Sequence, residues 1–74
     1  MEEPTAQMKL AGAIRRRREA LEFSQESFAD AIGMHRAQYG KVERGLVNMS
    51  IQTLSRVATG LGMSVATLAK SAKI

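Results

Sequence analysis

The stretch Ser24–Gly45, SQESFADAIGMHRAQYGKVERG, predicts two short helices joined by a brief turn. Ser24 is a suitable N-cap for the first helix, because its side-chain oxygen can accept an unpaired backbone N–H. Gly33 ends this helix, at a position where a left-handed backbone carries no Cβ penalty. The second helix is expected over about residues 35–43 and stops before Gly45. The turn is too brief for the two helices to lie antiparallel.

The second helix of this pair has one apolar side and one cationic side. At about 100° per residue, Tyr39 and Val42 fall on the apolar side. The opposite side carries only long basic or small side chains, namely Arg36, Ala37, Gly40, Lys41 and Arg44. This is the helix-turn-helix layout, in which one helix braces and the next is offered to the DNA major groove. The alternative is a solvated helix face with ordinary cations.

Small residues beside long cations allow close approach to a DNA groove. Arg36, near the helix N-terminus, is the best candidate for a bidentate contact to guanine O6 and N7, worth about 1–3 kcal/mol of discrimination. Gln38 falls at the edge of the exposed face, within reach of a base or a phosphate. The residues expected to read bases are Arg36, Ala37, Gln38, Gly40 and Lys41.

The composition places the chain among small basic single-domain proteins. With 74 residues it lies near the lower limit for a self-sufficient core, so self-association would help folding. Eleven Lys and Arg against seven Asp and Glu give a net charge of +4, which favours nucleic acid over a membrane surface as partner. Cysteine is absent, which excludes disulfides and thiolate zinc sites. No apolar run approaches the ~20 residues of a membrane span, and no signal-peptide pattern opens the chain, so a soluble intracellular protein is expected.

Helical periodicity continues on both sides of the helix pair. Residues 1–7 are expected to form a flexible lead, and residues 8–74 a single domain with the helix-turn-helix at about 25–44. Ser50 and Ser64 are expected to cap a fourth and a fifth helix. The expected inward-facing residues are Met8, Leu10, Ile14, Leu21, Phe28, Ala29, Ile32, Ile51, Leu54, Val57, Ala58, Val65 and Leu68. No segment alternates with period two, so the fold is predicted to be all-α with five helices.

Residues 25–45 resemble the helix-turn-helix of the Cro and phage-repressor class, the XRE family. The matching residues are Ser24, Gln25, Phe28, Ala29, Gly33, Tyr39, Val42, Glu43, Arg44 and Gly45. The similarity extends from about Ile14 to Leu68 and preserves the apolar spacing of all five helices. The resemblance implies a five-helix lambda-repressor-like domain that binds double-stranded DNA with sequence specificity and regulates transcription.

The resemblance also implies roles for residues around the recognition helix, the helix expected at residues 35–43. Gln25 is expected to contact a backbone phosphate, helped by the partial positive charge of a helix N-terminus. Glu43 is expected to turn back and pair with Arg18, which would lock the recognition helix without touching DNA. The residues expected at the DNA backbone are Ser24, Gln25, His35, Arg44 and Asn48.

Two residues depart from the family pattern, and a run of four arginines does not form a single basic stripe. His35 occupies the cap of the recognition helix, where relatives commonly carry Ser, Thr or Asp; an imidazole caps weakly or, when protonated, contacts a phosphate. Glu22 stands where relatives usually place glycine, at a cost of about 1 kcal/mol if a left-handed turn persists. The four arginines at residues 15–18 spread over about 300° of helix, so all but Arg18 are expected to be largely solvated.

Apolar residues towards the C-terminus exceed what a small bundle can cover alone. Operators of this class are read by two-fold dimers whose recognition helices lie one DNA turn apart. A homodimer through the fourth and fifth helices is therefore expected, with the interface residues Met49, Leu61, Met63, Val65, Leu68 and Ile74. The alternative is that these residues simply complete the monomer core.

Several kinds of short regulator fit the sequence: a Cro-like repressor, an antitoxin autoregulator, or a controller protein of a restriction–modification system. Residues 42–45 and 48–51 look most like the controller group, which also favours an arginine where Arg36 stands. Controllers usually carry an arginine where this chain has Val47. With no C-terminal sensor domain in the sequence, regulation through concentration and dimerisation is expected. The broader prediction is an autoregulatory repressor in the cytoplasm of a prokaryotic cell, or encoded by a phage.

A different class of function is an antitoxin-type interaction module, whose main partner is a toxin and whose DNA binding is secondary. An apolar face of the fifth helix left exposed in the free dimer would favour it. An enzyme is not expected, because one histidine and no cysteine supply no nucleophile with a base beside it. No cofactor and no metal are expected, since a lone histidine is not a metal site.

Overall fold

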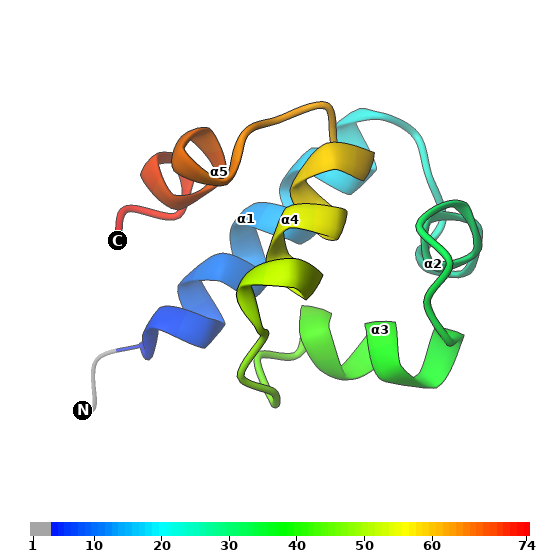
Figure 1. Ribbon diagram of the computed structural model, residues 1–74, viewed down its shortest axis with the longest axis horizontal. Helices are drawn as coiled ribbons and strands as arrows, with labels where there is room; N and C mark the ends of the chain where they lie inside the picture. The colour runs from blue at the N-terminus through cyan, green and yellow to red at the C-terminus, as the bar shows by residue number, and fades with distance from the viewer. Residues whose placement is uncertain (1–3) are drawn as a thin grey trace.

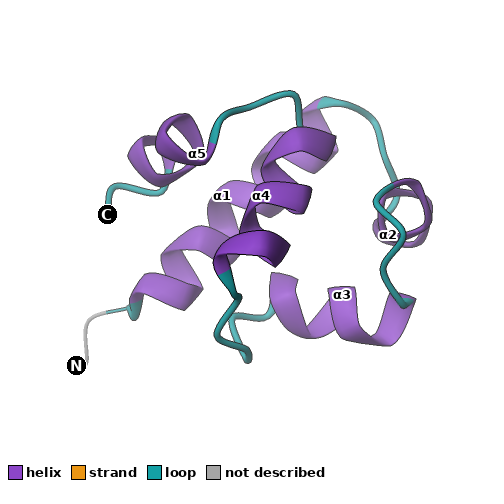
Figure 2. Cartoon of the chain, viewed as in Figure 1, coloured by secondary structure: helices purple, strands orange, loops and turns teal. Residues whose placement is uncertain are grey.

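A computed structural model describes residues 4–74, which form five α-helices (Figure 1). The helices are α1 (Ala6–Ala20), α2 (Gln25–Ala31), α3 (Arg36–Glu43), α4 (Ile51–Gly60) and α5 (Val65–Ser71). Figure 2 shows that loops alone connect them, with no strand in the described range. The predicted all-α class with five helices is confirmed. None of these helices is long and apolar enough to pass through a lipid bilayer.

Short hydroxyl side chains set where most of the helices begin. Four N-cap side chains accept the backbone N–H three residues on, namely Thr5, Ser24, Ser50 and Ser64. Ser24 also forms a reciprocal capping box with Ser27. Because Thr5 caps α1, this helix begins earlier than expected, and part of the predicted flexible lead is helical. Residues 1–3 of that lead lie outside the described residues.

The recognition helix α3 packs against α2 and α1, whereas α5 packs against α1 and α4. In Figure 1, α2 and α3 lie at the end of the molecule away from α5. One core joins these helices, and its largest fully buried side chains are Tyr39, Phe28, Ile14, Leu61, Leu68 and Val57. The ring centroid of Phe28 lies 5.3 Å from that of Tyr39 and 5.5 Å from that of Phe23. The recognition helix is thus anchored in the core through an aromatic side chain.

Three residues expected to face inward are exposed instead: Met8, Leu21 and Ile51. Ile51 opens α4 directly after its cap, and the inward stripe of this helix starts one turn later at Leu54. Leu21 is the C-cap of α1 rather than an interior helix residue. On α1, the small residues Ala11 and Ala13 are buried in addition to Ile14. Helical periodicity predicted the buried faces of the helices, but the predicted faces of α1 and α4 extend too far.

Leu61 and Leu68, expected at a dimer interface, are completely buried within the single chain. Leu61 is the C-cap of α4, and Leu68 lies in α5 where that helix packs against α1 and α4. Both side chains complete the monomer core and leave no surface for a partner. The assignment of these two residues to a dimer interface is therefore wrong.

The end of α1 adopts the left-handed backbone conformation without a glycine. Glu22 has a φ of 64°, close to the 69° of Gly33 at the end of α2. The backbone N–H of Glu22 bonds to the carbonyl of Glu19 at 2.9 Å, and that of Phe23 to the carbonyl of Arg18 at 3.2 Å. The turn that relatives make with glycine persists here, at a cost of about 1 kcal/mol.

We expect Gly60→Ala to destabilise the domain by about 1–3 kcal/mol, because it overpacks the contact between α4 and α2. An added Cβ would lie 2.4 Å from Ile32 Cγ2 and 3.1 Å from Phe28 Cζ, so the end of α4 would have to move. Urea unfolding followed by circular dichroism measures the change in the free energy of unfolding.

Gly12→Ala is the matched control for this substitution. Its Cβ would meet the flexible tip of the Arg16 side chain, at 3.3 Å, and alanine is the better helix former by about 0.5–1 kcal/mol. Gly12→Ala should therefore stabilise the protein. Equal stabilisation by both substitutions would contradict close packing of α4 on α2.

Candidate nucleic-acid interface

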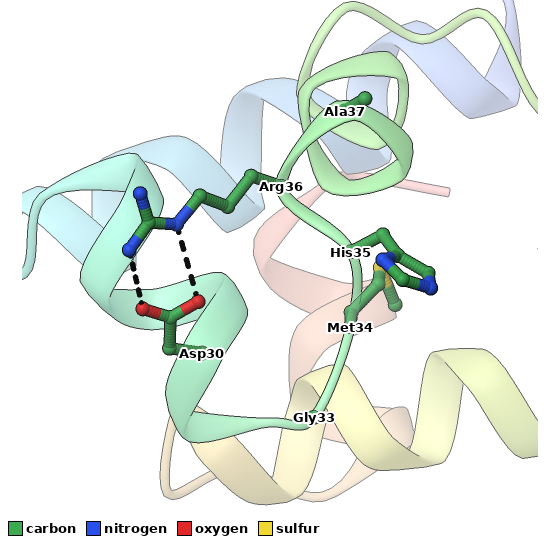
Figure 3. A pocket seen from close by; sticks show the side chains of 6 residues that line it. All are labelled: Asp30, Gly33, Met34, His35, Arg36 and Ala37. Carbon is green, nitrogen blue, oxygen red and sulfur yellow. Dashed lines mark hydrogen bonds and ion pairs between the residues drawn. The ribbon is translucent and has the colours of Figure 1, made fainter.

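The turn between α2 and α3 fixes the angle between the two helices. The backbone N–H of Gly33 bonds to the carbonyl of Asp30 at 3.1 Å, and that of Met34 bonds to the carbonyl of Ala29 at 2.9 Å. The Met34 side chain is buried, so the turn is held in the core. Figure 3 shows Met34 and His35 leading from this turn into α3. The recognition helix is therefore presented as a fixed part of the domain.

A buried ion pair connects α3 to α1. Arg18 Nε and Nη2 donate to Glu43 Oε2 and Oε1 at 2.6 and 3.0 Å, and both residues are buried. Arg18 Nη1 also donates to the Phe23 carbonyl at 2.7 Å. Gln25 Nε2 donates to Glu43 Oε1 at 3.2 Å, which adds α2 to the same network. The expected Arg18–Glu43 pair is present, and it ties the end of α3 to both neighbouring helices.

The ion pair shifts the titration of both partners. Burial alone raises the pKa of the Glu43 carboxyl group, but Arg18, through its hydrogen bonds and its charge, and the polar groups of Tyr39 and Gln25 more than offset this, so its pKa lies below the ordinary value. The hydrogen bond to Glu43 raises the pKa of Arg18. Both groups are therefore charged at neutral pH, and the pair stabilises the fold while Glu43 is ionised.

Tyr39 and Val42 hold the opposite side of α3 in the core. Their exposed fractions are 0% and 3%. The Tyr39 hydroxyl has no hydrogen-bond partner within residues 4–74. Burial raises the pKa of Tyr39, and the neighbouring Glu43 carboxylate raises it further, so the hydroxyl stays protonated. Tyr39 therefore serves α3 as a packing anchor rather than as a polar contact.

The cationic side of α3 faces solvent. The exposed residues are Arg36, Ala37, Gln38, Lys41 and Arg44. Gly40 differs from the expectation, because it is buried. A Cβ at Gly40 would lie 3.5 Å from Gln25 Oε1 and 3.6 Å from Arg44 Nη1, so these two side chains cover it. Gly40 is therefore not itself an open contact surface, and a Cβ there would make only ordinary van der Waals contacts with Gln25 and Arg44.

Arg36 is exposed but already paired with two carboxylates of α2. Its Nε and Nη2 donate to Asp30 Oδ1 and Oδ2 at 3.2 and 2.8 Å (Figure 3). Its Nη1 donates to Glu26 Oε2 at 2.8 Å. The hydrogen bond between Asp30 and Arg36 lowers the pKa of the former and raises the pKa of the latter. Sequence reasoning missed this contact, although residues four positions apart on a helix share a face and so signal an acidic patch.

The residues expected at the DNA backbone are all exposed: Ser24, Gln25, His35, Arg44 and Asn48. Three of them also make contacts within the protein. Ser24 belongs to the capping box of α2, Gln25 bonds to Glu43, and Asn48 accepts a hydrogen bond from Gln7 of α1. His35 is the N-cap of α3; its side chain is exposed and makes no capping hydrogen bond.

The loop after α3 lies beside the recognition helix. Gln38 and Val42 of α3 line a hollow of about 320 Å³ together with residues 47–50 and Thr53 of α4. The structure therefore brings Gln38, expected to read bases, next to Asn48, expected at the backbone. Arg36 is the first residue of α3, at the end of the helix that lies beside α2.

One member of the arginine run has a structural contact that was not expected. Arg17 is exposed, yet its Nε donates to the Leu61 carbonyl at 3.1 Å. Leu61 is the C-cap of α4, where the unpaired carbonyls attract a cation. Arg15 and Arg16 are exposed, as expected.

An exposed cationic helix, braced at a fixed angle by a second helix and locked by a buried ion pair, defines the helix-turn-helix class of DNA-binding domains. Residues 14–70 match the Helix-turn-helix family, HTH_3, and the chain belongs to that family. The expected resemblance to XRE-type regulators is confirmed. The protein is a DNA-binding transcription regulator, and its family is not an enzyme class.

Three relatives illustrate the match. Over 52 residues, 70% of each sequence, the chain is 38% identical to the control protein C.MunI of a Mycoplasma species. The crystal structure of the clp gene regulator ClgR from C. glutamicum superposes with a TM-score of 0.92 at 28% identity, over 97% of this chain and 92% of that one. The restriction-modification controller protein C.AhdI from Aeromonas hydrophila superposes with a TM-score of 0.79 at 34% identity, over 84% and 94%.

Glu43→Gln should destabilise the protein by about 3–5 kcal/mol at neutral pH, because it leaves the buried Arg18 charge without its carboxylate. The folded-state pKa of Glu43 is depressed, so its contribution is complete above the ordinary value of 4.5 and is lost as the pH falls through the folded-state pKa. The gap between the two proteins should therefore shrink as the pH is lowered below 4.5. Urea unfolding at a series of pH values measures it.

The control for this prediction is Glu19→Gln, which neutralises an exposed carboxylate on α1. It should change the free energy of unfolding by less than about 0.5 kcal/mol. A gap between the unmodified protein and Glu43→Gln that stayed constant from neutral to acid pH would show that ionised Glu43 is not the stabilising species.

Proposed function

We propose that the protein is a sequence-specific regulator that binds, as a homodimer, to a two-fold symmetric operator in double-stranded DNA. Each subunit would place α3 in the major groove. The observation that supports the proposal is the division of α3, whose apolar side at Tyr39 and Val42 is buried while its cationic side is exposed. The net charge of +4 adds attraction to the phosphates.

Among regulators of this class we favour a controller protein of a restriction–modification system that regulates its own expression in the cytoplasm of a prokaryotic cell. Two relatives are named as control or controller proteins, C.MunI and C.AhdI. They share 38% and 34% identity with this chain, more than the 28% of ClgR. Val47 replaces the loop arginine expected of controllers, so base recognition would rely more heavily on α3.

The exposed side of α3 would read the bases. Arg36 would donate to guanine O6 and N7, while Lys41 and Gln38 would reach neighbouring base edges. Ala37 would permit close approach, whereas Gly40, covered by Gln25 and Arg44, would not itself meet a base. The side chains that would contact phosphates and so set the register are Ser24, Gln25, His35, Arg44 and Asn48.

The dimer surface would use apolar residues of α4, α5 and the adjoining loops, of which the monomer leaves Leu46, Ile51 and Ile74 exposed and the others half-buried against its core. With Leu61 and Leu68 in the core, these residues are Leu46, Met49, Ile51, Met63, Val65 and Ile74. Leu46 and Ile51 were not expected there, yet they are 65% and 74% exposed. A second copy that covers them would stabilise a domain of this size.

The antitoxin-type alternative would need a more apolar outer face on α5. Leu68 of this helix is buried and Val65 is half-buried. Within residues 65–71, the structure therefore offers no large, freely exposed apolar side chain to a toxin. DNA binding is accordingly the function that we propose.

Arg36→Ala should weaken operator binding by about 1–3 kcal/mol, roughly 5- to 150-fold, and should flatten the base preference at one or two operator positions. Selection of bound fragments from random duplex DNA first defines the operator, its symmetry and its half-site spacing. Titration of the operator and its point variants then measures the loss.

Arg16→Ala is the control for this loss. Arg16 is exposed and lines a hollow with residues 71–73 at the end of α5, away from the recognition helix. Its removal should weaken binding slightly and equally for all sequences. Base reading by Arg36 is ruled out if Arg36→Ala retains the original preference at every operator position.

Ile51→Ser should weaken self-association while leaving the monomer folded, because the Ile51 side chain is 74% exposed. Sedimentation at micromolar concentration, with and without operator DNA, measures the oligomeric state. Leu21→Ser, at an exposed leucine that closes α1, should leave the dimer unchanged. Finding only monomers of the unmodified protein, both free and on DNA, would contradict the dimer.

A further inference from the structure

Carboxylates of α2 occupy three of the N–H groups of Arg36. The Nε and Nη2 edge donates to both oxygens of Asp30, at 3.2 and 2.8 Å, and Nη1 donates to Glu26 Oε2 at 2.8 Å. A guanidinium has five N–H donors, so two remain, one on Nη1 and one on Nη2. Guanine presents two acceptors in the major groove, O6 and N7. The paired Arg36 therefore keeps the hydrogen-bonding capacity that one guanine needs.

We propose that Asp30, helped by Glu26, is a positioning residue that determines specificity: it orients Arg36 for guanine and stays bonded to it in the DNA complex. This inference rests on the proposed function, because it takes Arg36 to read a base. Asp30 would not itself contact DNA. It would act through Arg36, forming a continuous chain of charge-assisted hydrogen bonds from α2 to the base.

The turn makes this support rigid. Asp30 lies in the last turn of α2, and Arg36 is the first residue of α3. Between them, the backbone N–H groups of Gly33 and Met34 bond back to α2 at 3.1 and 2.9 Å. An unrestrained arginine side chain loses rotamer freedom when it binds a base. Asp30 imposes much of that loss before DNA arrives, so less remains to oppose binding.

The same carboxylates also oppose binding to DNA that lacks the correct base. The side chains of Asp30 and Glu26 are 55% and 68% exposed, on the helix that braces α3. Near DNA they repel the phosphates. A guanine that accepts two hydrogen bonds from Arg36 compensates for this repulsion, whereas another base does not. Asp30 therefore strengthens operator binding and weakens binding elsewhere.

A competing arrangement predicts the opposite effect of neutralising Asp30 on operator affinity. If Arg36 had to leave Asp30 in order to reach DNA, the carboxylate would act as a lock, and its neutralisation would tighten operator binding. The direction in which operator affinity changes when Asp30 is neutralised therefore distinguishes the two arrangements.

Asp30→Asn provides that substitution, because it keeps the shape of the side chain and removes its charge. We expect operator affinity to fall roughly tenfold and affinity for a scrambled duplex to rise about twofold, so that specificity decreases. Fluorescence titration of both duplexes at one salt concentration measures the two affinities. Replacing the contacted guanine with 7-deazaguanine, which lacks N7, should shrink the difference between the unmodified protein and Asp30→Asn.

Controls exclude simpler causes. Glu19→Gln removes one exposed carboxylate from α1 and should shift both affinities by the same small factor. Glu26→Gln should act in the same direction as Asp30→Asn but more weakly, because Glu26 holds a single N–H of Arg36. Unchanged thermal unfolding of Asp30→Asn shows that the domain is intact.

Tighter operator binding by Asp30→Asn, or an unchanged ratio of operator to scrambled affinity, overturns the positioning role. Arg36→Ala, measured in parallel, keeps the two proposals apart. Base preference that survives Arg36→Ala overturns the reading role of Arg36 itself. Preference that is lost in Arg36→Ala but kept in Asp30→Asn overturns the role of Asp30 alone.

Discussion

The ion pair between Arg18 and Glu43 is the constraint on which the DNA-facing surface depends. In the proposed DNA complex, Glu43 ends a helix that lies close to phosphates, where an unpaired carboxylate would be repelled. Burial of such a charge is costly unless its acceptors are filled, and here Arg18 supplies two hydrogen bonds and Gln25 a third. The pair thereby removes a repulsive charge from the surface and fixes the end of the recognition helix to α1.

The ion pairs of Arg36 with Asp30 and Glu26 have a different effect because they are exposed. Arg18 and Glu43 are buried and hold the helix backbone, whereas Arg36, Asp30 and Glu26 are exposed and hold a side chain on that helix. Exposed pairs add little to stability. Their value here lies in orientation, since the guanidinium keeps both a defined position and unused donors. The position of α3 and the orientation of its first side chain, Arg36, are thus controlled by separate contacts.

The features of this structure that the sequence made predictable are the local ones, namely the ends of the helices and their buried faces. Ser24 and Gly33 bound α2 as expected, and the inward placement of Tyr39 and Val42 followed from helical periodicity alone. Periodicity does not reveal which neighbour covers a face, so Ile51 was expected inside although the core begins one turn later. Periodicity also cannot distinguish a monomer core from a dimer interface, which is why Leu61 and Leu68 were wrongly assigned to the interface. The contact of Arg36 with Asp30 depends on the angle set by the turn, and no local pattern encodes that angle.

The brevity of the helices has a consequence for how such a regulator is controlled. Helices α2, α3 and α5 contain seven, eight and seven residues, whereas isolated helices shorter than about 12–15 residues are marginal in water. Helices α2 and α3 therefore depend for their stability on packing in the shared core. In the proposed dimer, dilution favours separate subunits that unfold more often, and unfolded chains are degraded by cellular proteases. In such a dimer, scarce protein would be removed faster than abundant protein, which would sharpen the threshold at which the gene responds.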